Sequence, residues 1–154
     1  MIAPLLTTAA LALTHSCTAS DLRALGGNLN GATGTMDGFV AFRNRGSSAC
    51  RLGGVPSVVI ATRAGSRLRT MQRWDRSGNG ITVAQPGEHV MLPLDWANWC
   101  GTWGAPATRL RTLLLHLTLT AGARLTVSFT TGRPRCDAPS RKSTLFVGRF
   151  EREI

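Results

Sequence analysis

One cluster of aromatic and polar side chains has the residue types that bind sugars. The segment "DWANWCGTW", residues 95–103, holds three of the chain's four tryptophans. Indole rings stack on flat apolar faces such as those of sugar rings, while amides and carboxylates hydrogen-bond hydroxyl groups. In this hypothesis Trp99, Trp103 and Trp74 form a stacking surface, and Asn98 and Asp95 supply the polar groups.

The same tryptophans have a second interpretation, in which they pack around a disulfide. Strand alternation after Val90 places Trp96 in the core, and Trp99 directly precedes Cys100. A tryptophan packed against a disulfide is familiar in immunoglobulin-like domains. We favour packing for the cluster as a whole, which leaves Trp103 as the ring that a wet loop would expose.

Acid–base chemistry has few candidate residues in this chain. A glycosidase needs two carboxyl groups that face each other across a sugar, and Asp75 and Asp95, each next to a tryptophan, resemble such a pair. His116 is the candidate base, but it lies between Leu115 and Leu117, which alternation turns inward, so its imidazole points to solvent. The chain has no G-x-S-x-G elbow and no phosphate-binding glycine loop. We predict no catalytic residues and no enzymatic activity, with a hydrolase as the weaker alternative.

The four cysteines are predicted to form two disulfides. They lack the closely spaced pairs of a zinc site, and the histidines do not supply that spacing, so neither a metal nor a cofactor is expected. Three connectivities are possible. Pairing in sequence order closes the shortest loops and is preferred; it joins Cys17 to Cys50 and Cys100 to Cys136.

The first residues resemble the apolar part of a secretory signal. Residues 1–16 carry no charge, and their apolar run is too short to span a membrane, so no transmembrane segment is expected. We expect a signal-peptide remnant or disordered leader over 1–16 and a single domain over 17–154. With two disulfides, this predicts a secreted or cell-envelope protein. Cys17 could instead carry a lipid, although Thr14 and Ser16 do not fit the lipobox positions before it.

Charge is strongly one-sided. The chain has 18 basic and 8 acidic residues, a formal charge of +10, and 17 of the basic residues are arginine. A guanidinium is a planar fork that binds carboxylate or phosphate, so a cell-wall glycan or an acidic polymer is a candidate partner. The arginines are dispersed, with no basic run and no RNA-binding signature, which argues against a specific nucleic-acid partner.

The apolar pattern is that of an all-β domain. Apolar residues alternate along most segments, and glycine or proline interrupts them at short intervals. We predict eight or nine strands in an antiparallel, two-sheet, immunoglobulin-like β-sandwich. Turns are expected at "LTAGARL", around Gly122, and at "QPGEH", around Gly87. The segment "ASDLRALGG" is predicted as a short helix or a first edge strand.

Three segments resemble a known family. They are "FRNRGSSACRLGGVPSVVI", "WANWCG" and "PRCDAPSRKSTLFVGRF", which match landmarks of the actinobacterial family catalogued as domain of unknown function 4232. The resemblance implies a disulfide-containing β-sandwich in exported proteins or lipoproteins, with structural landmarks at Asn44, Gly46, Cys50, Leu52, Gly54 and Pro56. No catalytic or binding residue follows from it. We expect an exported cell-envelope module of uncharacterised, non-enzymatic function that acts by binding or association, with glycan or polyanion binding as the alternative.

Overall fold

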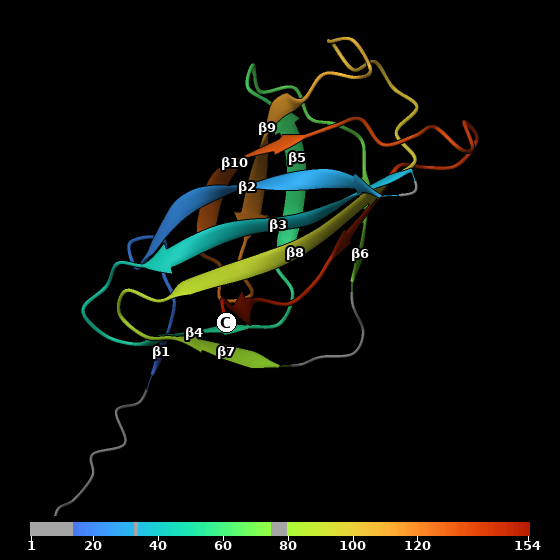
Figure 1. Cartoon of the computed structure of the whole chain (residues 1–154). Helices are drawn as coiled ribbons and strands as arrows, with labels where there is room; N and C mark the ends of the chain where they lie inside the picture. Colours follow the sequence, from blue (N-terminus) through green and yellow to red (C-terminus); the bar gives the residue numbers. More distant parts are fainter. Residues whose placement is uncertain (1–13, 33, 75–79) are drawn as a thin grey trace, which may run out of the picture.

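The computed structural model describes residues 14–32, 34–74 and 80–154, and within these ranges it contains strands and no helix (Figure 1). No helix in this part of the chain is long and apolar enough to cross a membrane. The described strands are β1 (His15–Ser16), β2 (Leu22–Ala32), β3 (Thr35–Asn44), β4 (Cys50–Gly53), β5 (Ser57–Thr62), β6 (Met71–Trp74), β7 (Ile81–Ala84), β8 (His89–Ala97), β9 (Arg111–Thr118), β10 (Arg124–Thr131), β11 (Thr144–Val147) and β12 (Glu151–Arg152).

The strands form two sheets, and both sheets are mixed. The larger sheet has the order β5-β9-β10-β2-β3-β8-β11-β6, with β12 also paired to β8, and the smaller has the order β1-β4-β7. The pairs β10–β2, β11–β6 and β1–β4 are parallel. The all-β class and the two sheets are therefore confirmed. The purely antiparallel pairing is wrong, and so is the strand number, because strands of two to four residues are too short to show alternation.

Strand β2 corrects the prediction for "ASDLRALGG". This segment is neither a helix nor an edge strand, because β2 lies between β10 and β3. The glycines predicted to end a helix instead let the strand bend: Gly26 has a φ of 98°, at an irregularity in the β2–β3 register. A Cβ on Gly27 would lie 2.2 Å from the carbonyl oxygen of Phe39, so only glycine permits this close approach.

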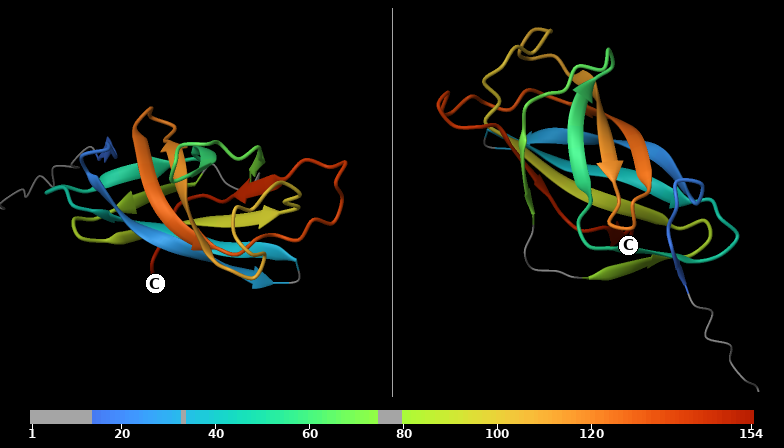
Figure 2. Two further views of the ribbon diagram at one scale, coloured as in Figure 1. Left: turned by 90° about the horizontal axis from the view of Figure 1, so that it is seen from above. Right: turned by 180° about the vertical axis from the view of Figure 1, so that it is seen from behind.

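The core lies between the two walls of the larger sheet. Seen from above, the sheet curls, so that β5, β9 and β10 lie across from β3 and β8 (Figure 2). The predicted alternation is confirmed in β8, where Val90, Leu92, Leu94 and Trp96 are buried. It is confirmed in β9 as well, where the leucines at 113, 115 and 117 are buried. Their apolar surface is the main force that holds the two walls together.

One glutamine nearly closes the larger sheet into a barrel. Strands β5 and β6 are its two outermost strands, and each would otherwise present unpaired backbone groups. Gln72 of β6 accepts a hydrogen bond from the Val58 backbone N–H at 2.9 Å. Its amide nitrogen donates to the Pro56 carbonyl at 2.8 Å. The side-chain amide thus takes the place of a neighbouring strand along this part of β5.

Both predicted disulfides are confirmed, as are both predicted turns. Cys17 bonds to Cys50, and Cys100 bonds to Cys136. The first bond uses the Cys17 sulfur, so a lipid on that atom is incompatible with it. Gly122 and Gly87 have φ angles of 95° and 82° at the two turns. Of the predicted leader, 1–13 lies outside the described residues, whereas 15–16 belongs to the folded part as strand β1.

Candidate functional site

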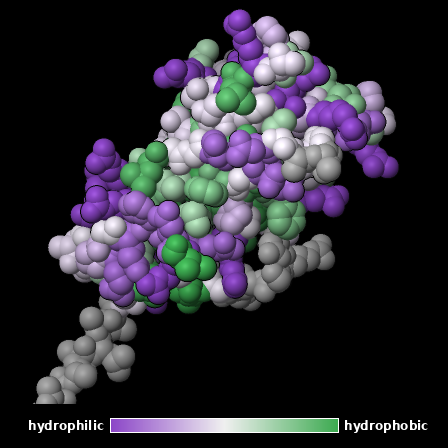
Figure 3. Space-filling view, in the orientation of Figure 1, coloured by the Kyte–Doolittle hydropathy of each residue, from purple (hydrophilic) through white to green (hydrophobic). Residues whose placement is uncertain are grey.

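Three loops meet at one end of the larger sheet and enclose a pocket. They follow β5, precede β9 and precede β11, and they lie together at the top of Figure 1. Figure 3 shows hydrophilic side chains at this end, interspersed with paler and hydrophobic ones. The pocket has a volume of about 550 Å³. Its lining includes Thr62 and residues 66–69 around the first loop, residues 98–102 and Gly104 of the second, and Arg141 and Ser143 of the third.

Four arginines line this pocket, which we call the arginine pocket. Arg67, Arg69 and Arg141 are exposed, and among the described residues none of them forms an ion pair. Arg111 is held in place: its guanidinium donates to the Trp103 carbonyl and lies 5.8 Å from the centre of the Trp103 ring. No carboxylate occurs among the described lining residues. The pocket therefore concentrates positive charge that no carboxylate of the described lining neutralises, which is the electrostatic condition for binding an anion.

Asn98 fixes the loops that form the pocket. Its side-chain oxygen accepts hydrogen bonds from the backbone N–H groups of Asp137 and Ala138, at 3.0 and 2.9 Å. Its side-chain nitrogen donates to the carbonyls of Ala138 and Arg141, at 3.0 and 3.1 Å. Asn98 also has a φ of 57°, a conformation that asparagine tolerates better than most residues. The amide thus makes two donor and two acceptor hydrogen bonds within the protein, and through them Asn98 positions the loops of the pocket.

The tryptophan cluster is a piece of the core. Trp96, Trp99 and Trp103 are 0%, 8% and 4% exposed. The Trp96 ring lies 5.6 Å from Trp99 and 6.0 Å from Trp103, centre to centre. Their N–H groups donate to Ser143, Thr102 and Arg109, in that order. The expected exposure of Trp103 is thus wrong, and Trp99 and Trp103 offer no free face to a sugar.

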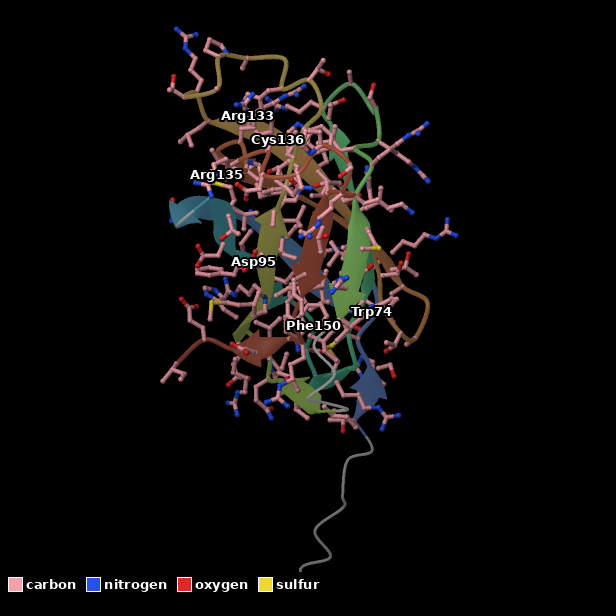
Figure 4. All side chains as sticks on the ribbon, turned by 90° about the vertical axis from the view of Figure 1, so that its right-hand side faces the viewer. Trp74, Asp95, Arg133, Arg135, Cys136 and Phe150 are labelled. Atoms are coloured by element: carbon pink, nitrogen blue, oxygen red, sulfur yellow. A yellow bond between two sulfur atoms is a disulfide. The ribbon has the colours of Figure 1, made fainter. Side chains whose placement is uncertain are left out.

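The remaining candidates, Trp74 and Asp95, lie away from the pocket. Trp74 is 56% exposed on β6, and Figure 4 shows it far from Cys136 and the second disulfide. Asp95 is half-buried on the outer face of β8, directly opposite Asp37 of β3. Burial raises the pKa of the Asp95 carboxyl above its usual range, and the neighbouring Asp37 carboxylate raises this pKa further. Of the five predicted ligand-binding residues, the structure therefore keeps Asn98, Trp99 and Trp103 together at the loop end and places Trp74 and Asp95 away from them.

The raised pKa of Asp95 predicts a pH-dependent effect on stability. A carboxyl whose pKa is higher in the folded protein than in the unfolded chain destabilises the fold wherever it is charged in both. We expect Asp95→Asn to raise the urea midpoint at neutral pH. The gain should disappear below the usual aspartate pKa of 3.8, where the carboxyl is protonated in both states. Urea unfolding at both pH values measures this, and an equal gain at acid pH would contradict it.

The residues of the hydrolase hypothesis are not brought together where the structure describes them. Asp75 lies outside the described residues. His116 is exposed on the outer face of β9 and hydrogen-bonds Thr126 at 2.9 Å. Asp95 is on β8, and three strands lie between β9 and β8 in the sheet. His116 and Asp95 line separate hollows on the surface.

One group of possible metal ligands occurs among the described residues. Ligand atoms of His15, Asp21 and Cys50 lie within 4.8 Å of one another. The Cys50 sulfur is bonded to Cys17 and is no thiolate, and metals bind the thiolate form. The Asp21 carboxylate is also occupied: it accepts hydrogen bonds from the backbone and the side chain of Thr18, both at 2.8 Å, which lower its pKa. The cluster therefore fits a structural turn.

A family model described as a domain of unknown function, DUF4232, matches residues 17–150. The chain belongs to this family. A comparison with curated proteins gave no match, and neither did a comparison with solved structures. The match contains both disulfides of this DUF4232 domain and every residue that lines its arginine pocket.

The structure explains one landmark of this DUF4232 domain. Asn44 is completely buried. Its side-chain nitrogen donates to the carbonyls of Ser48 and Ala84, at 3.0 and 2.9 Å, and its oxygen accepts the Gly46 N–H at 2.8 Å. A buried amide with these partners fixes the loop between β3 and β4. The interpretation of Asn44 as a structural residue is therefore confirmed.

The arginine pocket of the DUF4232 domain is what reasoning from sequence missed. Its four guanidinium groups come from three segments that the fold brings together from positions 67–69, 111 and 141. No local motif marks any of them, because each is one arginine among 17. The only signal in the sequence was the general excess of arginine. It indicates that the partner is anionic, but it does not indicate where on the fold the partner binds.

Proposed function

We propose that this DUF4232 domain is an exported, non-enzymatic binding module of the bacterial cell envelope, of actinobacterial origin, whose arginine pocket takes an anionic ligand. The observation that carries the proposal is the meeting of four guanidinium groups around one hollow with no carboxylate among its described lining residues. In such a site each anionic oxygen can accept charge-assisted hydrogen bonds from a planar fork.

The disulfides and the family support the extracytoplasmic part of this proposal. Disulfides persist in oxidising compartments and are rare in the cytosol, and this chain pairs all four of its cysteines. The resemblance described above implies exported proteins and a β-sandwich with disulfides, and the strand pattern favours an immunoglobulin-like one, of which the mixed sheets here would be a variant. A binding module needs a rigid support for its loops, and the Cys100–Cys136 bond and Asn98 provide one.

Titration with a trisaccharide of galacturonic acid, which carries a carboxylate on each sugar, tests the pocket. We expect binding at low salt, and a threefold to fivefold weaker affinity for Arg69→Gln and for Arg141→Gln, since an exposed ion pair is worth up to about 1 kcal/mol. Isothermal titration calorimetry measures these affinities. The uncharged maltotriose should not bind.

Arg51→Gln is the matched control, because it changes the net charge equally and lies on β4 in the smaller sheet. It should bind the acidic trisaccharide as the wild type does, within twofold. If Arg51→Gln weakens binding as much as Arg69→Gln, attraction to the overall charge explains the binding, and the pocket has no special role.

A further inference from the structure

A second hollow adjoins the arginine pocket. It has a volume of about 550 Å³ and lies on the outer face of β5, β9 and β10, the strands that face the viewer in the right-hand view of Figure 2. Arg67 lines both hollows. Its backbone pairs with Ala61 at the outer edge of β5, so it stands at the boundary between the loop end and the sheet face. The two hollows therefore form one continuous surface, which we call the basic track.

The sheet register shows what the second half of the basic track offers. Ser57, Thr118 and Arg124 lie side by side across β5, β9 and β10. In the next row His116 lies beside Thr126, and the two side chains are hydrogen-bonded at 2.9 Å. These side chains are exposed, and no described residue lining this hollow is acidic. The track thus continues as hydroxyl groups and one imidazole and ends on a further guanidinium, that of Arg124.

The length of the track exceeds that of a single sugar. Arg67 and Arg124 are separated by three strand spacings and by the four positions from Ser128 to Arg124. With about 4.8 Å per spacing and about 3.3 Å per residue, the two arginines are on the order of 20 Å apart. The arginine pocket extends beyond Arg67 at the other end. A ligand that contacts Arg141 and Arg124 together must therefore be a chain of several units.

We infer that the ligand is an acidic polysaccharide, which enters the arginine pocket and continues across β5, β9 and β10 to Arg124. This inference rests on the proposed function and adds the substrate class to it. Repeated anionic groups match guanidinium groups spaced along the track. Serine and threonine hydroxyls, which both donate and accept, match the hydroxyl groups of the sugars between those charges.

Nucleic acid fits the track less well than a glycan. Proteins that bind single strands without reading sequence stack successive bases on exposed aromatic rings. Among the described residues that line the two hollows, the one tryptophan is Trp99, and it is 8% exposed. The exposed Trp74 lines neither hollow. The track therefore lacks the stacking surface that a strand of bases needs.

The test compares a galacturonic acid trisaccharide with a dodecasaccharide, on the wild type and on Arg124→Gln. Affinities are expressed per sugar residue, which removes the gain that a long chain has merely because it can bind in more registers. We expect the wild type to bind the dodecasaccharide more tightly on this scale. Arg124→Gln should bind the dodecasaccharide threefold to fivefold more weakly than the wild type, while its affinity for the trisaccharide stays the same. The slope of the logarithm of dodecasaccharide affinity against the logarithm of salt concentration should also become shallower by about one.

Each other outcome has a definite meaning. If Arg124→Gln leaves the dodecasaccharide affinity unchanged, the track is not used, while trisaccharide binding that depends on Arg69 keeps the proposed function standing. If the wild type binds neither glycan at low salt, the proposed function fails, and this inference fails with it. Tighter binding of single-stranded DNA of matched charge would overturn the glycan assignment. Arg51→Gln again controls for net charge, and unchanged melting temperatures show that the variants fold.

Discussion

Replacement of both Cys17 and Cys50 by alanine is expected to lower the free energy of unfolding by about 2–5 kcal/mol. The disulfide closes a separation of 33 residues, which restricts the unfolded chain. Its two cysteines are also 2% and 0% exposed, so their removal leaves a cavity among packed side chains. The bond ties the start of the domain to β4 and thus holds the smaller sheet together. Urea unfolding of the oxidised wild type and the double variant measures the difference.

The second disulfide supplies a matched comparison. Cys100 and Cys136 are separated by 36 residues, so the effect of their bond on the unfolded chain should be nearly the same. Both are exposed, so the Cys100→Ala and Cys136→Ala double variant creates no buried cavity. We therefore expect removal of the Cys17–Cys50 bond to lower the free energy of unfolding by more than removal of the Cys100–Cys136 bond. Equal losses would show that the burial of the first bond contributes nothing to the folded state.

The features of the fold that could be predicted are those that the residue pattern within a single strand determines. Leu113, Leu115 and Leu117 are separated by single residues that face outward, and this alternation is enough to assign both the strand and its buried face. The disulfide pairing preferred from separation along the chain, among three possible connectivities, was also correct. Strand β2 could not be assigned from its own sequence. Its glycines could either end a helix or permit a bend within a strand, and only the neighbouring strand distinguishes these two possibilities. Gly27 is required by the backbone of Phe39, which lies in β3.

The site was harder to predict than the fold, because exposure is a property of the packed loops. Trp103 lies two residues after Gly101 in a long loop, and nothing in that segment indicates that its ring lies against Trp96. Gly101 contributes to this packing, since a Cβ there would lie 2.7 Å from the Trp99 ring. The aromatic residues that resembled a binding surface are instead buried in the core beneath the loops. Of the arginines that we propose as binding groups, Arg111 is held by this cluster, through the Trp103 carbonyl and the Trp103 ring.

Asn98 contributes both to the stability of this end of the domain and to the proposed binding site. Its replacement should therefore lower both the free energy of unfolding and the affinity for an acidic glycan. Asn98→Ala loses four side-chain hydrogen bonds, and it leaves an alanine in the left-handed conformation. We expect a loss of about 2–4 kcal/mol in the free energy of unfolding, at about 1 kcal/mol for each net hydrogen bond. Arg141 lies on the loop that Asn98 fixes, so the affinity for acidic trisaccharide should fall as well, by about tenfold.

Two further variants separate the backbone from the side chain at this position. Asn98→Gly also loses the four hydrogen bonds, but glycine adopts a positive φ without strain, so it should be more stable than Asn98→Ala by about 1 kcal/mol. Asn98→Asp keeps the two acceptor interactions with Asp137 and Ala138 and loses the two donor interactions, so its stability should fall between those of the alanine variant and the wild type. Its affinity is left out of the comparison, because Asn98 lines the pocket and a carboxylate there would repel an anion directly. If Asn98→Ala lost affinity with no loss of stability, the amide would instead contact the ligand directly. A parallel loss of stability and affinity in Asn98→Ala and Asn98→Gly identifies Asn98 as the residue that positions the pocket.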